Sequence, residues 1–455
     1  LESISNLVIR MSELAEQAAN GSMTNTQRAG LSSEYEQLDF EIRRLSKVTN
    51  FNGLNLLEGG KSTSTAAILT SDPTFAGNIA VSADGRFRAF SNGTAVVVFD
   101  TLTNTQRNVA TAGGSGANKV KVLANGDTVF QAMNVGNTAS DIYYYDYAAG
   151  TTRKLTDSQT SSDLGNSEVS ADGTKAVFTA STAYVDNQVS DAATGGGPFQ
   201  AYVIDTSSRV VRKLGVGGAT ASSSVAISAN GNYVSVALGI ASLLVANTNS
   251  DVLNLYTTNP AGTARLSGVT NSGKAYYSIN NQNVNVIDAL TGTAQTVKTL
   301  GTHGNLQMST DGQSIYMTST GNLTGENGAG SRQVFKLDVA SLELSQLTNY
   351  TSQLSDGAAT SGAFSADGGR FSYISATTTI LDFDITPDAN NFDFEVGFGN
   401  AGGIVAQLNS TLRSIRGLGG LNVASRVMAS AALDRSRENI KALALLRGTI
   451  GAAQS

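Results

Sequence analysis

The chain contains two kinds of sequence, and the kind found at both ends is interrupted by the other. Residues 1–58 and 404–455 carry apolar side chains at helical spacing and few turn residues, whereas the middle is rich in Gly, Ser, Thr and Asn. We therefore predict an α + β multidomain protein. A discontinuous helical rod takes residues 1–64 and 398–455, and an all-β domain is inserted at residues 65–397.

The N-terminal segment predicts two helices joined by a tight turn. Asn20 and Gly21 end the first helix, because glycine tolerates the left-handed conformation found just after a helix. Thr24, Asn25 and Thr26 offer side chains that can cap the second helix. In the first helix the apolar positions, three and four residues apart, are Leu1, Ile4, Val8, Met11, Ala15 and Ala18. In the second helix they are Leu31, Tyr35, Leu38, Ile42 and Leu45.

The C-terminal segment predicts one short helix and one long helix. The short helix has apolar residues at Ile404, Leu408, Leu412 and Ile415, and glycines end it at Gly417, Gly419 and Gly420. The long helix, capped by Asn422 or Ser425, runs toward residue 453 with apolar residues at Leu433, Ile440, Leu443, Leu446 and Ile450. Isolated helices of this length are marginal in water, so we expect one antiparallel bundle. Because the chain begins with Leu and ends within a helix, we also expect further helical sequence at each end.

A four-residue turn related to Ser-Ala-Asp-Gly recurs seven times in the middle segment. The copies are residues 82–85, 123–126, 170–173, 228–231, 270–273, 309–312 and 365–368, and their glycines lie 39 to 58 residues apart. Asp-Gly and Asn-Gly favour hairpin turns in which both central positions take positive φ. Four short strands per repeat of this length indicate a blade of a β-propeller. We predict seven blades, with six or eight as alternatives, and the pattern resembles the TolB-like propeller class.

A propeller has to close its ring of blades. The segment at residues 66–70 ends like the fourth strands of the other repeats. We predict that it completes the last blade beside residues 379–384. Both ends of the propeller would then lie together, which is what insertion into a helical rod requires.

Few residues of the chain suggest catalysis or metal binding. His303 is the single histidine and cysteine is absent, which excludes the usual zinc site. We interpret His303 as a loop residue without a role, and the turn aspartates as turn formers. An acidic run could bind calcium, although solvated acids at the domain junction are the favoured interpretation: Asp382, Asp384, Asp388, Asp393 and Glu395. We predict no catalytic residue, no metal site and no cofactor.

A tyrosine-rich run at residues 143–147 lies on a predicted third strand. Because successive side chains on a strand point to opposite faces, alternation would bury two tyrosines and expose the others. Packing is the favoured interpretation, and a patch that stacks on sugars is the alternative.

The composition bears on partners and on location. The formal net charge of −6 argues against nucleic acid or an anionic membrane as the partner. No apolar run is long enough to span a bilayer, and no signal-peptide pattern is visible. The absence of cysteine fits a chain that is exported unfolded through a narrow channel.

Both ends of the chain resemble bacterial flagellin. The stretches that carry the resemblance are residues 13–21, 48–57, 420–423 and 446–454. It implies a rod of two N-terminal helices and one C-terminal helix, with a hairpin at Asn50, Phe51, Asn52 and Gly53, interrupted by a variable outer domain. It also implies self-association into an extracellular filament for motility, export without a cleaved signal peptide, an export chaperone and a filament cap. The terminal segments that line the filament core in this family are absent from the sequence.

The resemblance also implies a contact motif in the first helix. Arg10, Glu13 and Leu14 match by position the motif that a vertebrate innate immune receptor reads in flagellins, which is also a possible subunit contact. Ser12 stands where a second arginine is often found. Leu14 is equally well interpreted as a packing residue.

We therefore predict a structural subunit of the bacterial flagellar filament, not an enzyme. Its propeller would be exposed on the surface and stand away from the filament axis. An alternative is that the propeller is an adhesin or glycan-binding module displayed on the filament. An enzyme and a hook–filament junction protein are the remaining alternatives.

Overall fold

The computed structural model describes both helical ends and the strands between them. The described residues are 2–48, 50–51, 54–55, 62, most of 66–385, 415, 423–424 and 426–454. Within 66–385 the described part excludes residues 72–77, 92–94, 111–117, 134–138, 159–163, 187, 190–193, 215–221, 239–241, 251–252, 258–263, 289–290, 293, 340–341, 352–353, 355–361 and 376–378.

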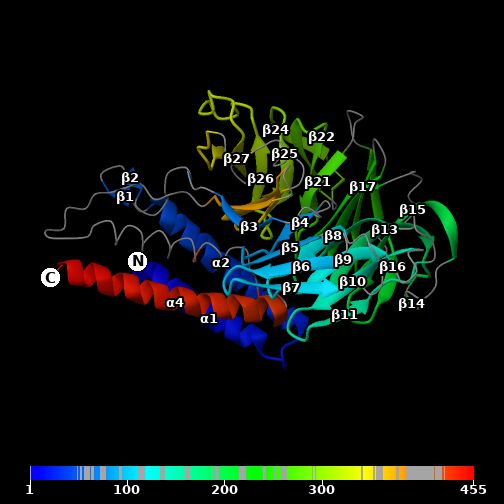
Figure 1. Cartoon of the computed structure of the whole chain (residues 1–455), viewed down its shortest axis with the longest axis horizontal. Helices are drawn as coiled ribbons and strands as arrows, with labels where there is room; N and C mark the ends of the chain where they lie inside the picture. The colour runs from blue at the N-terminus through cyan, green and yellow to red at the C-terminus, as the bar shows by residue number, and fades with distance from the viewer. Residues whose placement is uncertain are drawn as a thin grey trace.

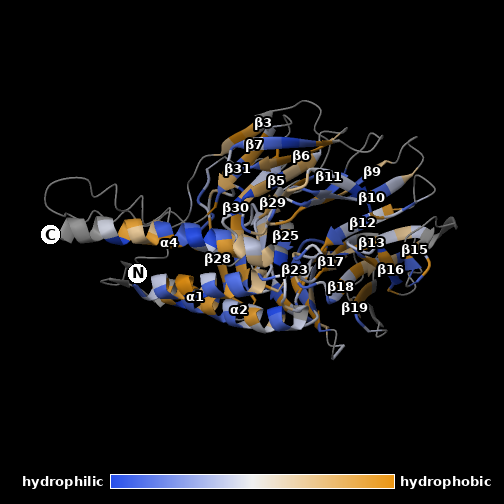
Figure 2. Cartoon of the chain, turned by 90° about the horizontal axis from the view of Figure 1, so that it is seen from below, coloured by the Kyte–Doolittle hydropathy of each residue, from blue (hydrophilic) through white to orange (hydrophobic). Residues whose placement is uncertain are grey.

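Three long helices from opposite ends of the chain form one rod (Figure 1). They are α1 (Glu2–Ala19), α2 (Asn25–Val48) and α4 (Arg426–Gln454). Helix α1 packs against both α2 and α4, so the predicted meeting of the two ends is confirmed. Figure 2 shows the three helices lying side by side along one side of the propeller. Of the predicted short helix only Ile415 is described, and it is buried in the core of the rod.

The turn between α1 and α2 is held by side chains on both sides. Thr24 and Gln27 form a reciprocal cap, since Gln27 N donates to Thr24 Oγ1 at 3.3 Å and Thr24 N donates to Gln27 Oε1 at 2.9 Å. The buried Arg28 donates from Nε to the carbonyl of Ala18 and from Nη2 to that of Asn20. These bonds satisfy the carbonyls that the end of α1 leaves without helical partners.

The middle of the chain forms seven antiparallel sheets among the described residues, which confirms the predicted propeller with seven blades. The first blade contains β4 (Ile79–Val81), β5 (Phe87–Ser91), β6 (Ala95–Asp100) and β7 (Thr105–Ala110). The second contains β8 (Asn118–Val122), β9 (Thr128–Met133), β10 (Ser140–Asp146) and β11 (Thr151–Lys154). The third contains β12 (Leu164–Val169), β13 (Lys175–Ala183), β15 (Thr194–Asp205), β16 (Val210–Lys213) and the short β14 (Gln188–Val189).

The remaining blades follow the same order. The fourth contains β17 (Ser222–Ile227), β18 (Tyr233–Leu238), β19 (Ser242–Asn247) and β20 (Leu253–Thr257). The fifth contains β21 (Ala264–Val269), β22 (Lys274–Ile279), β23 (Asn283–Asp288) and β24 (Ala294–Thr299). The sixth contains β25 (Gly304–Met308), β26 (Ser314–Ser319), β27 (Gln333–Asp338) and β28 (Leu344–Gln346).

The seventh blade closes the ring with strands from both ends of the inserted segment. Its strands are β29 (Gly362–Phe364), β30 (Arg370–Ile374), β31 (Thr379–Asp384) and β3 (Ala67–Ser71). Strand β3 pairs with β31, with Ala67 opposite Asp382 and Ile68 opposite Leu381. The predicted closure is therefore confirmed. The predicted domain boundaries at residues 64/65 and 397/398 remain predictions.

The seven repeated turns join the first and second strands of each blade, and glycine alone takes positive φ in them. The seven glycines have φ between 68° and 87°, whereas the Asp, Asn or Ser residues that precede them do not have positive φ. The expectation that both central positions would be left-handed is therefore wrong. In the first copy, Gly85 N donates to the carbonyl of Ser82, and Asp84 accepts hydrogen bonds from Ser82 Oγ at 2.6 Å and from Arg86 N at 3.2 Å. The aspartate thus forms the turn through its side chain.

Candidate functional site

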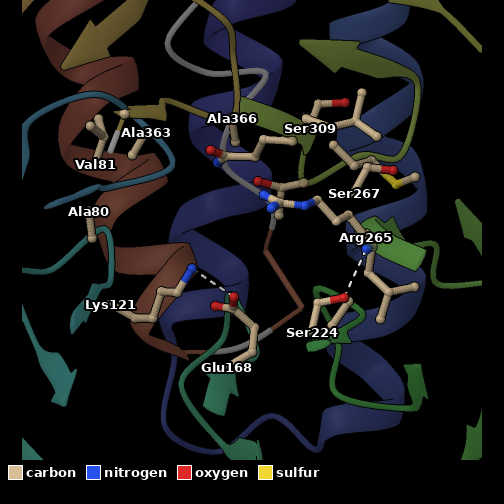
Figure 3. Close-up of a pocket in the computed structure, with 18 of the residues that line it drawn as sticks. Ala80, Val81, Lys121, Glu168, Ser224, Arg265, Ser267, Ser309, Ala363 and Ala366 are labelled. Atoms are coloured by element: carbon tan, nitrogen blue, oxygen red, sulfur yellow. Dashed lines mark hydrogen bonds and ion pairs between the residues drawn. The ribbon is translucent and has the colours of Figure 1, made fainter. Parts of the chain in front are cut away.

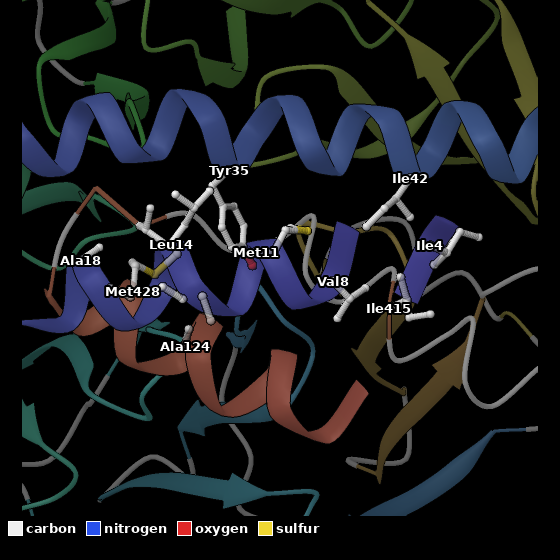
Figure 4. Close-up of a cluster of buried hydrophobic side chains, with 14 of the residues drawn as sticks. Ile4, Val8, Met11, Leu14, Ala18, Tyr35, Ile42, Ala124, Ile415 and Met428 are labelled. Atoms are coloured by element: carbon white, nitrogen blue, oxygen red, sulfur yellow. The ribbon is translucent and has the colours of Figure 1, made fainter. Parts of the chain in front are cut away.

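The core of the rod is built from the predicted apolar stripes (Figure 4). From α1, the side chains of Ile4, Val8, Met11, Ala15 and Ala18 are buried; Leu14 is buried with them, and Leu7 lies against the cluster. Helix α2 contributes Tyr35 and Ile42, and α4 contributes Met428, Ala429, Ala432 and Leu443. Burial of these residues removes much apolar surface from water, which is the main force that holds the rod together.

The proposed contact motif of α1 is divided between the core and the surface. Leu14 is fully buried in the rod core. Arg10 is exposed and donates to Glu34 of α2, from Nη2 at 2.6 Å, and to Glu13, from Nη1 at 3.0 Å. The hydrogen bond to Glu34 is the main reason why the pKa of Arg10 is raised. Only Arg10 and Glu13 are therefore presented on the outer face, and their role in recognition remains a prediction.

Each helix of the rod also carries an apolar side chain on its outer face. Ile9 on α1, Phe40 on α2 and Leu445 on α4 are exposed, with 41%, 60% and 65% of their surface accessible. A contact with another subunit would cover such residues. Sequence reasoning grouped none of them as a site, because each lies outside its helix's main stripe.

The hairpin that the flagellin resemblance implies is present in part. Strand β1 (Asn50–Phe51) pairs with β2 (Leu54–Asn55), with Asn50 opposite Asn55 and Phe51 opposite Leu54. Asn52 and Gly53 lie outside the described residues.

The propeller packs directly on the rod with the face that carries the repeated turns. Ala124 and Ala171, the second residues of two turns, are part of the same apolar cluster as the helices. Arg435 of α4 reaches a third turn, donating from Nη2 to the carbonyl of Asp84 at 3.4 Å. A signal for this contact was in the sequence, since five of the seven turns have alanine at this position: Ala83, Ala124, Ala171, Ala229 and Ala366.

The single histidine lies in a loop just before β25, as predicted, but its side chain is buried. His303 is 4% exposed, and its Nε2 lies 3.2 Å from Ser278 Oγ. Its Nδ1 has no hydrogen-bond partner among the described residues. Burial lowers the pKa of His303 to about 4, because desolvation disfavours the charged imidazolium.

The acidic run is not a group of solvated acids where it is described. Asp382 is 4% exposed and forms an ion pair with the fully buried Arg88, whose Nε lies 2.8 Å from Asp382 Oδ1. Asp384 lies 3.7 Å from Arg370. Asp388, Asp393 and Glu395 lie outside the described residues. Within the described part of the chain, no group of three or more possible metal ligands is found.

The tyrosine run is a packing feature rather than an exposed patch. Tyr143, Tyr144 and Tyr145 are all buried, so the expected exposure of alternate tyrosines is wrong. Tyr143 and Tyr145 pack against the first blade, whereas Tyr144 packs toward the third blade. Alternation is preserved, but neighbouring blades cover both faces of the sheet.

Sequence comparison relates the chain to bacterial flagellins. Residues 1–62 match the bacterial flagellin N-terminal helical region. Flagellin 1 of Proteus mirabilis is 32% identical over 125 residues, which are 27% of this chain and 32% of the relative. Polar flagellin F of Vibrio parahaemolyticus is 38% identical over 64 residues, which are 14% of this chain and 17% of the relative. The chain thus spans a third or less of the length of these curated relatives.

Solved structures resemble the chain only weakly. A streptogramin B lyase has a TM-score of 0.46 at 12% identity, covering 71% of this chain and 96% of its own. An oligogalacturonate lyase from Vibrio parahaemolyticus has a TM-score of 0.47 at 12% identity, covering 71% of this chain and 95% of its own. These values support no argument about chemistry.

None of the described helices is apolar over a length that would cross a membrane. The matched region contains α1, α2 and both strands of the hairpin, where the N-terminal part of the sequence resemblance was found. The matches and the fold together identify a flagellin-type helical rod with a seven-bladed β-propeller inserted into it.

Proposed function

We propose that this chain belongs to a subunit of the bacterial flagellar filament, a structural protein that polymerises outside the cell and serves swimming. The observation that carries the proposal is the packing of α1 and α4, from opposite ends of the chain, around a single apolar core. The match to the flagellin N-terminal helical region, at residues 1–62, includes α1 and α2. No residue has to perform catalysis for this role.

Filament growth requires a contact between two different surfaces of each subunit, repeated without closing into a ring. A rod offers such surfaces along its length, and α1, α2 and α4 each present an exposed apolar side chain: Ile9, Phe40 and Leu445. Both ends of the chain lie at the same end of the rod, away from the propeller (Figure 1). Neighbouring rods can therefore approach there without contacting the propeller.

The propeller is proposed to be an outer domain exposed on the filament surface, inserted at residues 65–397 between the two parts of the rod. Its support is the pairing of β3 with β31, which brings the two ends of the insertion together. An export chaperone, a filament cap and export without a cleaved signal peptide are further proposals that rest on the flagellin resemblance. Display of the propeller does not require it to stand apart from the rod.

Removal of the propeller tests the proposal. In the full-length gene of a motile strain, residues 66–385 are replaced by a short Gly/Ser linker. Paired residues on adjacent strands are roughly 5 Å apart, so the linker spans a short gap. We expect filaments in electron micrographs and retained swimming. A secreted variant with normal helical circular dichroism but no filaments would contradict a rod-based assembly.

A substitution in the rod core tests the same proposal from the other side, by disrupting the rod and keeping the propeller. Val8 is fully buried in the rod core, so Val8→Asp in the full-length chain should abolish filaments. Filaments that form normally with Val8→Asp would show that the described rod is not the assembling unit.

A further inference from the structure

The propeller encloses a cavity of about 860 Å³ along its axis, within the range of cavities that hold small ligands. The first strand of every blade contributes to its lining, and Figure 3 shows it with the helices behind. Ala124 and Ala171 line the cavity and also pack in the rod core. The rod therefore covers the end of the channel at which the repeated turns lie.

The opposite end of the channel carries polar groups from the fifth and sixth blades. Strand β25 runs from this end toward its turn, so His303, just before the strand, lies away from the rod. Pairing of Ser319 with Gln333 places the neighbouring Thr320 and Arg332 at the same end. We call this end the far mouth.

The charges in the channel are not balanced. Among the described lining residues, Glu168 is the single carboxylate, and Lys121 binds it at 2.7 Å. Arg265 is exposed and extends into the cavity (Figure 3), and it forms no ion pair with a described residue. Arg265 therefore supplies a positive charge in a channel whose one described carboxylate is already paired.

Ser278 lies between Arg265 and His303 and is a neighbour of both. Arg265 lies directly opposite Ser278 in the pairing of β21 with β22, so their side chains share one face of the sheet. Ser278 in turn binds His303 Nε2. Arg265 and His303 thus line one cavity from adjoining positions, and Nδ1 of His303 is buried there without a hydrogen-bond partner among the described residues.

We propose that the far mouth binds a small monoanion that bears a carboxylate, with Arg265 as its main partner and with His303 Nδ1, which a turn of the buried ring would expose to the cavity, as a second donor. A guanidinium matches a carboxylate with two parallel hydrogen bonds. His303 donates from Nδ1 when Ser278 donates its hydroxyl hydrogen to Nε2. Arg265 is exposed at this mouth whereas Arg332 is partly buried, so the single charge of Arg265 favours a carboxylate over the more highly charged phosphate.

The single histidine provides a direct probe of this site. The full chain, labelled with ¹⁵N-histidine, is titrated at neutral pH with sodium glucuronate, with glucose as the uncharged control and inorganic phosphate as the second anion. We expect a saturable shift of the His303 ring signals with glucuronate alone. No shift with glucuronate, an equal shift with glucose, or tighter binding of phosphate would each overturn the proposal.

Two variants distinguish binding at Arg265 from a general effect of the protein's positive charge. Arg265→Gln is expected to weaken glucuronate binding by about tenfold or more, since a hydrogen bond between charged groups is lost. Lys298→Gln removes the same charge from the outer strand of the same blade, where Lys298 binds only the exposed carbonyl of Leu342 among the contacts described. It should change the affinity less than about twofold. If circular dichroism shows both variants folded, an equal loss of glucuronate affinity in the two would overturn the assignment to Arg265.

Discussion

At the scale of single residues, Arg88 shows how the ring of blades is held closed. It extends from the second strand of the first blade and is fully buried, with Nε 2.8 Å from Asp382 Oδ1 and Nη2 3.1 Å from Oδ2. Asp382 lies on the third strand of the last blade. Because a buried charge is stable only when it is paired, each residue requires the other.

Replacing Arg88 alone should therefore lower the free energy of unfolding more than replacing both Arg88 and Asp382. Arg88→Met leaves Asp382 with the more distant Arg370, at 3.6 Å, and we expect unfolding in urea to show a loss of about 3 kcal/mol or more. The double variant Arg88→Met/Asp382→Leu should recover most of this loss, because no buried charge remains. A double variant as unstable as the single one would contradict the explanation.

His303 should give the fold a dependence on pH. The pKa of His303 is about 4 in the folded chain and 6.5 ordinarily, so between these values the unfolded chain binds a proton that the folded chain does not. Stability should then fall as the pH drops from 6.5 to 4, by up to about 3 kcal/mol from this residue.

The pH effect is measured as a difference between two proteins. Denaturation of the wild type and of His303→Gln is compared at neutral pH and near pH 4. The variant should gain stability relative to the wild type as the pH falls, because it has no imidazole to protonate. A stability difference that is the same at both pH values would argue against a lowered pKa.

At the scale of elements, the repeated turns were predictable in position but not in conformation. Ser-Ala-Asp-Gly and its relatives mark where a strand reverses, because their residues favour turns in any fold. Which residue takes positive φ depends on the hydrogen bonds of the whole turn, such as that from Ser82 Oγ to Asp84. The burial of Tyr143 and Tyr145 was likewise decided by the adjacent blade, which the sequence of one strand does not reveal.

Two glycines with nearly the same φ allow the free-energy cost of backbone strain to be measured apart from the cost of a side-chain clash. Gly368 has φ 68°, and a Cβ there would lie 2.2 Å from the ring of Tyr316, whereas Gly150 has φ 67° and open space around it. Gly150→Ala should cost about 1 kcal/mol. Gly368→Ala should cost about 3 kcal/mol or more, since the buried ring must move. Denaturation midpoints that fall equally would contradict this difference.

At the scale of the whole molecule, the propeller and the rod share buried surface. Ala124 and Ala171 pack with the helices, and Arg435 binds the turn at Asp84. Sequence reasoning placed the rod and the propeller in the correct order but made no statement about contacts between them, and the expectation that the propeller stands away from the filament axis remains a prediction. The described contacts join the turn face of the propeller to the side of the rod, so we expect the two parts to unfold together.

A charge placed in this contact should uncouple the two parts. Ala124→Glu would put a carboxylate into the rod core, at a cost of about 3 kcal/mol or more. The helical circular dichroism and the near-ultraviolet tyrosine signal should then melt at different temperatures. Ala149→Glu, in the exposed turn before β11, is the matched control. Its free energy of unfolding should stay within about 0.5 kcal/mol of the wild-type value. Separate melting in the wild type would contradict the coupling.

The sequence by itself determined the three helical stripes, the seven turns and the closing strand at Ala67–Ser71, because helix periodicity and turn chemistry act over a few residues. Only the tertiary structure decided the partner of Asp382, the burial of His303 and the face of the propeller that meets the rod. Each of these depends on a surface brought in from a distant part of the chain. Local spacing shows which side chains share a face, but not what covers that face.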